Sequence, residues 1–227
     1  MKKLSLPLLL LISCAWMTAE EATVRGSVKI VHNSKRQAGN SDAVIWLTAE
    51  HSNEIPAAGR PTRLLQKNKT FIPHVTAITI GTRVEVPNQD PFFHDAFSIY
   101  QGKPFNLGLY EAGAVRTVRF SQPGISYIFC NIHPEMSAVV ITLSTRHFAR
   151  TKPDGSFEIR QVPPGKYKLR VWYELASQGE LDSLTRDVDL TQGDNALQPL
   201  TLTSSDVTIE HLNKYGEAYV SEKPVRY

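Results

Sequence analysis

The sequence predicts an all-β protein. Turn residues such as Gly81, Asn88 and Gly113 recur at short intervals between residues 64 and 144. Short runs of β-branched and aromatic residues lie between these turns, which is the spacing of a β-sandwich. No long stretch follows the helical period of 3.6 residues. At 227 residues, the chain is long enough for one large or two modest domains.

The N-terminus has the pattern of an export signal. Two lysines precede an apolar run from Leu4 to Ile12, which is too short to span a membrane. We therefore expect residues 1–19 to be a signal peptide and the protein to be periplasmic or secreted. Residues 11–14 also resemble a bacterial lipoprotein box, in which Cys14 would carry a lipid anchor. The formal charge of +3 includes the two leader lysines, so no nucleic-acid partner is expected.

The strands can be placed from the alternation of apolar and polar residues. This alternation predicts one strand from Val24 to Ile30 and, after a polar turn, a second from Ala43 to Leu47. Residues 49–63 are rich in Ala, Pro, Gly and Arg, which indicates a linker. Further strands are expected at Phe71-Ile72, Ala77 to Ile80, Arg83 to Val86, Ala96 to Ile99, Val115 to Phe120, Ser126 to Phe129 and Ala138 to Leu143.

The pattern changes after Arg146. Asp154-Gly155 is a hairpin signal, and residues 163–165, Pro-Pro-Gly, turn the chain into another alternating run. Two more strands are expected at Thr185 to Leu190 and Leu197 to Thr203. The tail from 206 to 227 is polar and aromatic and receives no predicted element.

A cluster of metal-ligand residue types lies in one short loop. Cys130, His133 and Met136 fall within seven residues, and beyond residue 19 the chain has no other cysteine or methionine. A lone thiol in an oxidising compartment is a buried inert residue, an intermolecular bridge or a metal ligand. A mononuclear copper site takes one thiolate, two imidazoles and a weak axial ligand such as a thioether. His94 is the best upstream candidate for the second imidazole, because it follows a turn-rich loop and opens a strand.

These residue types also occur in other kinds of site. Zinc accepts cysteine and histidine, but a thioether is a poor zinc ligand and structural zinc sites usually hold more cysteines. Glu135 is an alternative axial ligand to Met136. Taken singly, Cys130 would be a buried small hydrophobe and His133 a surface histidine. His74 is expected to be solvent-exposed or capping rather than a ligand.

Residues 64–144 resemble a cupredoxin, the family of blue type 1 copper proteins. The resemblance is carried by the Cys-x-x-His-x-x-Met loop, by Asn88 six residues before His94, and by the Phe-x-Pro motif at 71–73. Among the cupredoxins, the loop resembles that of amicyanin in particular, since plastocyanins usually carry two more residues before the methionine. The resemblance implies a Greek-key β-sandwich with one copper ion. In that site His94, Cys130 and His133 lie in the plane and Met136 is axial. Asn88 would tie the two ligand loops together, whereas Asp95 departs from the asparagine that cupredoxins often carry.

The flanking segments resemble a second β-sandwich family, the carboxypeptidase regulatory-like or transthyretin-like domains. Gly26-Ser27-Val28 and Ala43-Val44-Ile45 match the opening strands of that family, and the run from Val162 to Leu169 matches a closing strand. The resemblance implies a smaller sandwich split between residues 23–48 and 148–205. The cupredoxin domain, residues 60–146, would be inserted into it, and residues 206–227 would form a C-terminal tail.

The function expected from these features is electron transfer by an exported copper protein to an unidentified redox partner protein. His133 would be the exit for electrons, within an apolar docking patch of Phe92, Phe93, Ile132 and Pro134; packing within the loops is the alternative role for these four residues. Copper delivery without a redox partner is one alternative function. A cell-surface adhesion or carbohydrate-binding module that has lost its metal is another. An enzyme is not expected, because a site with four protein ligands leaves no open position for a substrate.

Overall fold

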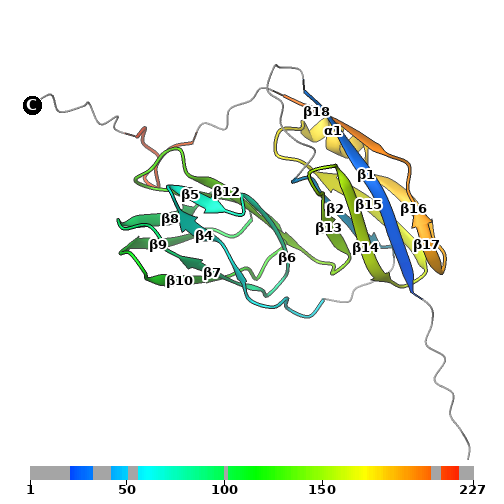
Figure 1. Cartoon of the computed structure of the whole chain (residues 1–227), viewed down its shortest axis with the longest axis horizontal. Helices are drawn as coiled ribbons and strands as arrows, with labels where there is room; N and C mark the ends of the chain where they lie inside the picture. Colours follow the sequence, from blue (N-terminus) through cyan, green and yellow to red (C-terminus); the bar gives the residue numbers. More distant parts are fainter. Residues whose placement is uncertain (1–20, 33–41, 51–55, 100–101, 206–210, 220–227) are drawn as a thin grey trace, which may run out of the picture.

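The computed structural model describes residues 21–32, 42–50, 56–99, 102–205 and 211–219 (Figure 1). The predicted signal peptide, with Cys14, lies outside the described residues. The elements are β1 (Ala22–His32), β2 (Val44–Ala49), β3 (Thr62–Arg63), β4 (Leu65–Lys67), β5 (Thr70–Ile72), β6 (Val75–Thr79), β7 (Arg83–Pro87), β8 (His94–Ser98), β9 (Phe105–Tyr110), β10 (Val115–Arg119), β11 (Gly124–Cys130), β12 (Ser137–Leu143), β13 (Phe148–Arg150), β14 (Ser156–Val162), β15 (Gly165–Trp172), α1 (Gln178–Ser183), β16 (Arg186–Leu190), β17 (Gly193–Ala196) and β18 (Leu200–Ser204). In the described part of the chain, no helix is long and apolar enough to cross a membrane.

The predicted all-β fold class is confirmed. The short helix α1, capped by the Ser177 side chain, was not predicted, because six residues are too few to show a helical period. Strand β9 was also missed, because Gly108 and its neighbours suggested a turn. Gly108 has φ +69° and lies near a register shift between β8 and β9, so it marks an irregularity within the strand.

Two sheets enclose the core that lies beneath the ligand loop. One sheet has the order β10-β7-β3, and the other has the order β6-β12-β11-β8-β9. Val84 and Phe120 from the region of the first sheet pack with Ile128 and Val140 from the second in one buried cluster, which also contains Cys130. The strand ends that carry the candidate ligands are therefore fixed by a packed core.

Two further sheets form a second sandwich beside the first (Figure 1). Strand β1 pairs with β14, β17 and β18, and strand β2 pairs with β13 and β15. Residues before position 50 thus pair with residues after 147. Gly26 opposes Phe157 across β1 and β14, and a Cβ at Gly26 would lie 2.6 Å from the Phe157 ring. The glycine of the Gly-x-Val motif therefore serves close packing within a strand.

Strand β12 is buried on both faces and joins the two sandwiches. Ala138 and Val140 belong to the core that holds Cys130, whereas Val139 and Ile141 belong to the core of the second sandwich. This alternation follows from the two-residue period of a strand. The continuous apolar run seen in the sequence is therefore the signature of a strand between two layers.

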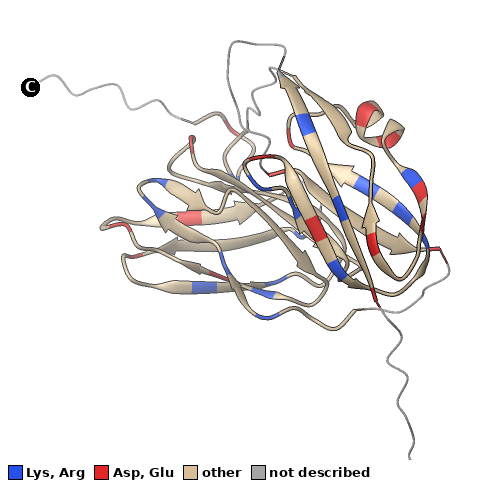
Figure 2. Cartoon of the chain, turned by 45° about the vertical axis from the view of Figure 1, so that its right-hand side comes forward, with Lys and Arg blue, Asp and Glu red and all other residues tan. Residues whose placement is uncertain are grey.

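Charged residues of both signs lie on neighbouring strands of the second sandwich (Figure 2). Arg25 on β1 pairs with Glu158 on β14 at 2.9 Å and with Asp194 on β17 at 2.5 Å. These are exposed pairs, which contribute little to stability because water screens them. Opposite charges therefore pair across neighbouring strands at this surface, which is not a charged face of one sign.

His74 links the two sandwiches. Its Nε2 lies 2.6 Å from a carboxylate oxygen of Glu174, which follows β15, and its Nδ1 lies 3.1 Å from the carbonyl oxygen of Ser137. The hydrogen bond to Glu174 raises the pKa of His74 above its usual 6.5, against burial, which lowers it. His74 was expected to be solvent-exposed or capping, and the structure places its partly buried ring in an ion pair between the two sandwiches.

We expect His74→Gln to destabilise the protein at mildly acidic pH. A raised pKa in the folded state means that the stabilisation is full below pH 6.5 and is lost as the pH rises through the raised pKa. The His74 side chain is 40% exposed, so the effect should not exceed about 1 kcal/mol. Denaturant unfolding of wild type, His74→Gln, Glu174→Gln and the double variant at several pH values measures it. A coupling energy that does not fall with rising pH contradicts the assignment.

Candidate metal centre

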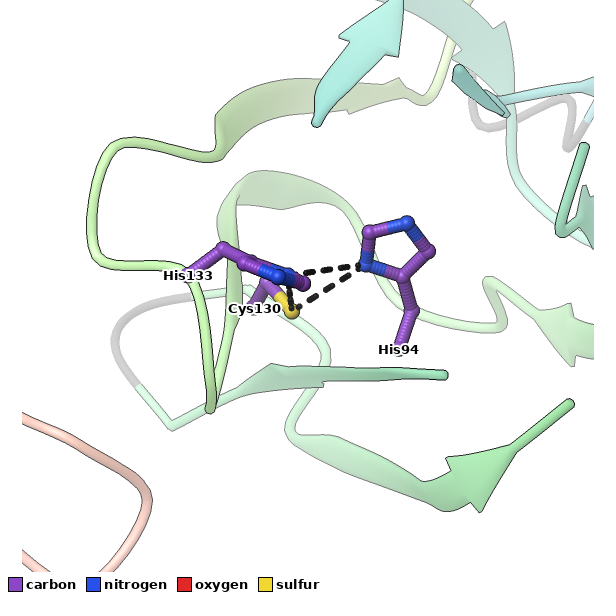
Figure 3. A group of neighbouring side chains, drawn as sticks. All are labelled: His94, Cys130 and His133. Atoms are coloured by element: carbon purple, nitrogen blue, oxygen red, sulfur yellow. Dashed lines mark hydrogen bonds between the residues drawn. The ribbon is translucent and has the colours of Figure 1, made fainter. Parts of the chain in front are cut away.

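Three side chains from two loops converge on one point. His94 opens β8, Cys130 ends β11, and His133 lies in the loop before β12 (Figure 3). The two Nδ1 atoms of the histidines are 3.1 Å apart, and each lies 3.6 Å from the Sγ of Cys130. Among the described residues, this is the group of His, Cys, Asp or Glu side chains placed to hold a metal ion.

The triangle has the size that a metal requires. A metal with bonds of about 2.0 Å to nitrogen and 2.3 Å to sulfur spaces its donors roughly 3.5 to 3.8 Å apart in a trigonal plane. The two sulfur edges match this spacing and the nitrogen edge is slightly shorter. The two loops thus present two imidazoles and a thiol in the arrangement of a mononuclear site.

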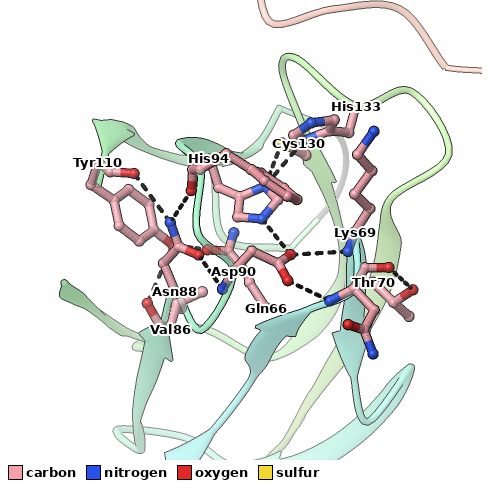
Figure 4. A network of polar contacts seen from close by, with 12 residues as sticks. Gln66, Lys69, Thr70, Val86, Asn88, Asp90, His94, Tyr110, Cys130 and His133 are labelled. Carbon is pink, nitrogen blue, oxygen red and sulfur yellow. Dashed lines mark hydrogen bonds and ion pairs between the residues drawn. The ribbon is translucent and has the colours of Figure 1, made fainter. Parts of the chain in front are cut away.

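Asp90 fixes the tautomer of His94. Its carboxylate accepts a hydrogen bond from His94 Nε2 at 2.9 Å, and both side chains are almost fully buried (Figure 4). In the neutral imidazole the proton of this bond is on Nε2, which leaves the lone pair on Nδ1, the nitrogen that faces Cys130 and His133. A carboxylate in this position orients a ligating imidazole and raises its basicity.

Asp90 is itself held by the turn between β4 and β5. The backbone N–H groups of Asn68 and Lys69 donate to its two carboxylate oxygens at 2.6 and 2.9 Å. Asn68 and Lys69 both have positive φ, as a two-residue hairpin turn requires, and this directs their amides to Asp90. Burial raises the pKa of Asp90, but these hydrogen bonds and the one from His94 outweigh burial and lower it overall. Asp90 is therefore a carboxylate and not a neutral acid.

The other two ligand candidates are also affected by burial. Burial raises the pKa of the Cys130 thiol, so a metal must displace a proton to bind the sulfur. Burial also lowers the pKa of His133, and the nearby His94 and Lys69 lower it further. A neutral imidazole at His133 is the form that binds a metal.

Met136 is fully buried in the same cluster as Cys130, whereas Glu135 is exposed. The Met136 N–H donates to the carbonyl of His133 at 3.0 Å, and the Cys130 N–H donates to the carbonyl of Met136 at 3.2 Å. These bonds close the loop tightly. Between the two axial candidates, burial favours the thioether.

The hydrogen bonds of the Asn88 side chain lie within and beside the upstream ligand loop, and its expected tie between the two ligand loops stays a prediction. Its amide nitrogen donates to the carbonyl of Phe92 at 2.8 Å, and its amide oxygen accepts from the N–H of Asp90 at 3.0 Å. These bonds shape the upstream loop itself. In the described part of the chain, the two ligand loops are joined by the Asn131 N–H, which donates to the carbonyl of Asp95 at 2.8 Å.

The four predicted docking residues differ in exposure. Phe93 is 50% and Ile132 is 44% exposed, and Pro134 is also exposed. Phe92 is only partly exposed, because its ring packs against the rings of His94 and His133 at centroid distances of 5.3 and 5.5 Å. Phe92 therefore has the loop-packing role that was the alternative.

Several residues of the site were not found from the sequence. Tyr110 donates to Gln66 at 2.7 Å beside Asn88, and both side chains are fully buried (Figure 4). One local feature could have indicated Asp90, because it is a carboxylate four residues before the candidate ligand His94. Lys214 and Tyr219, which contact the ligand loops from the C-terminal tail, had none.

The fold and site define the chain as an all-β protein with a candidate His-Cys-His metal centre. Protein-family models and curated proteins gave no match. Similar solved structures include a copper-containing nitrite reductase (NirK) from Thermus scotoductus SA-01, with a TM-score of 0.35 and 24% identity over 50% of this chain. This chain spans 28% of the length of that reductase.

Two further similar structures are cupredoxins. A purple cupredoxin from Nitrosopumilus maritimus has a TM-score of 0.31 and 26% identity, over 34% of this chain and 84% of that one. Amicyanin from Paracoccus versutus (Thiobacillus versutus) has a TM-score of 0.33 and 20% identity, over 44% of this chain and 97% of that one. At these scores, the functional argument depends on the site geometry alone. The resemblance of the second sandwich to transthyretin-like domains stays a prediction.

The expectation that the chain is not an enzyme is corrected by the match to a nitrite reductase, which is an enzyme. The sequence argument held that a site with four protein ligands has no position for a substrate. That argument concerned only substrate binding at the metal itself, and it does not apply to an enzyme in which such a site passes electrons. Enzymatic activity is therefore open for this chain.

Proposed function

We propose that the protein is an electron-transfer protein with one copper ion bound by His94, Cys130 and His133 and by Met136 as the axial ligand. The observation that carries this proposal is the closed triangle of Nδ1, Sγ and Nδ1 atoms, with the lone pair of His94 fixed by Asp90. Copper would supply one-electron chemistry by cycling between Cu(I) and Cu(II).

The chain's own residues provide rigidity and exclude water. His94, Cys130 and Met136 are fully buried, and the loop between Cys130 and Met136 is closed by its own backbone hydrogen bonds. A site that cannot relax changes little between two metal oxidation states, and such preorganisation avoids a reorganisation cost. The thioether of Met136 favours copper over zinc here, because a thioether is a poor zinc ligand.

We place the contact with a redox partner protein around His133, which is partly exposed. Phe93 and Ile132 flank it as exposed apolar side chains, a surface that suits transient docking. On the basis of the leader-like residues 1–19, the proposed location is the periplasm or the cell exterior, with a lipid anchor at Cys14 as an alternative to a soluble product.

We also propose that residues 60–146 form a copper domain inserted into a sandwich made of residues 23–48 and 148–205. The pairing of β1 with β14 and of β2 with β15 supports this division. The inserted domain shares β12 with the second core, so the second sandwich acts as a rigid scaffold for it.

Loading with Cu(II), followed by visible and EPR spectroscopy and voltammetry, tests the function. We expect one copper per chain, intense thiolate-to-copper absorption and a reversible one-electron potential. A colourless protein that binds only Cu(I) would indicate copper delivery instead. Absence of stoichiometric copper would contradict both and leave an adhesion or carbohydrate-binding module.

A further inference from the structure

The C-terminal segment 211–219 lies against the candidate metal loop. In Figure 1 the chain leaves β18 on the second sandwich, and the red segment lies beside the other sandwich, near the loop between β11 and β12. Part of the segment is visible at the lower left of Figure 3, and the contacts of Lys214 and Tyr219 place it against the loop of Cys130 and His133. The segment returns to the site from the far sandwich, about 80 residues after the loop in the sequence, as the Lys214 to Asn131 contact shows.

Tyr219 contacts the backbone of the candidate cysteine ligand. Its hydroxyl donates to the carbonyl oxygen of Cys130 at 2.9 Å. The N–H of Cys130 is bound to the carbonyl of Met136, so both backbone polar groups of Cys130 are held. One bond comes from within the loop and the other from the tail.

His211 packs on the same loop. Its ring stacks on Phe129, the residue before Cys130, at a centroid distance of 3.8 Å and an angle of 20°. Its Nε2 donates to the carbonyl of Pro134 at 2.9 Å, and its Nδ1 lies 3.2 Å from the Tyr219 hydroxyl. The ring therefore covers Phe129 and lies against the Tyr219 hydroxyl.

Lys214 connects the segment to both ligand loops. Its backbone N–H donates to the side chain of Asn131 at 3.0 Å, and its Nζ lies 2.6 Å from the carboxylate of Asp95. The Lys214 side chain is 15% exposed and that of Asp95 is 4% exposed. A buried carboxylate next to a ligand histidine needs a partner of opposite charge. Lys214 therefore accounts for the aspartate that stands where cupredoxins often carry asparagine.

We propose that residues 211–219 form a strap that holds the ligand loop, with Tyr219 as the positioning residue for Cys130. The inference deepens the proposed function and depends on it for the effect on copper. The strap holds Cys130 through its carbonyl oxygen and Asn131 through its side chain. Lys214 of the strap also pairs with the carboxylate of Asp95, the residue after His94. His211 of the strap also contacts Pro134, one of the four residues of the predicted docking patch.

The test uses Tyr219→Phe in the full-length protein, which removes one hydroxyl and keeps the ring. The matched control is Tyr167→Phe, because the Tyr167 hydroxyl also donates to a backbone carbonyl, that of Pro163 at 2.8 Å, but in the second sandwich. Two readouts are measured: the rate at which the Cys130 thiol of the metal-free protein reacts with a disulfide reagent, and the Cu(II) spectrum and potential of the loaded protein.

Loss of one hydrogen bond of about 1 kcal/mol should let the loop open more often, so the thiol of Tyr219→Phe should react roughly five- to tenfold faster than in wild type. The thiolate-to-copper band and the potential should shift as well, and Tyr167→Phe should leave all of these unchanged. Equal rates, spectra and potentials for Tyr219→Phe and wild type, or equal acceleration in both variants, would overturn the strap. The two proposals separate if copper-loaded wild type lacks the thiolate-to-copper band while the Cys130 thiol of metal-free Tyr219→Phe still reacts faster than that of wild type. In that case the copper proposal fails and the strap stands.

Discussion

Cys130→Ser is expected to abolish the intense visible absorption of the Cu(II)-loaded protein. The absorption requires a thiolate bound to Cu(II), and Cys130 supplies the only sulfur in the triangle with His94 and His133. A serine hydroxyl of similar size stays protonated near neutral pH and does not replace the thiolate. Absorption and EPR spectra of the loaded variant measure the loss.

His147→Gln is the matched control for replacement of a histidine elsewhere. His147 is partly buried in the second sandwich, with its ring 6.2 Å from that of Tyr167. We expect His94→Gln and His133→Gln to lose the wild-type spectrum and His147→Gln to keep it. An unchanged spectrum in Cys130→Ser would mean that the assignment of the ligands is wrong.

Asp90→Asn is expected to weaken copper binding by about 10- to 100-fold, the range for loss of a partner that orients a metal ligand. Three N–H groups point at the two oxygens of Asp90: those of Asn68, Lys69 and His94 Nε2. An asparagine has one oxygen and one NH₂ group, so at least one of these donors would face another donor. Competition titration with a copper chelator measures the affinity.

The same substitution should raise the reduction potential. The negative charge of Asp90 stabilises the higher positive charge of Cu(II) through His94, so its removal favours Cu(I). Asp154→Asn is the control, because Asp154 also accepts a backbone N–H, that of Ser156 at 2.9 Å, in an exposed turn of the second sandwich. An affinity and potential equal to those of wild type in Asp90→Asn would show that Asp90 does not support His94.

The sequence made the local part of the site predictable and left the distant part hidden. Cys130, His133 and Met136 share one loop, so their spacing can be read directly. His94 could be added because a turn-rich loop leads into its strand. The amides that hold Asp90 belong to a hairpin turn about twenty residues upstream, and only the fold brings Asn68 and Lys69 to it.

The strap was hidden for the same reason. Residues 211–219 have no alternating or helical pattern, because their role is to contact a surface built by strands far away in the sequence. Lys214 lies next to Asp95 only in the folded protein, because β18 on the second sandwich precedes the segment that contains Lys214. The strand pattern was easier to predict, because burial on one face leaves a period-2 signal and burial on both faces leaves a continuous run, as in β12.

X-ray absorption spectroscopy at the copper edge of the loaded wild-type protein tests the central claim most directly. The proposed site predicts one short copper–sulfur distance from Cys130 and two imidazole nitrogens, from His94 and His133, around each copper ion. Copper surrounded by nitrogen and oxygen atoms alone, with no sulfur at bonding distance, would contradict it.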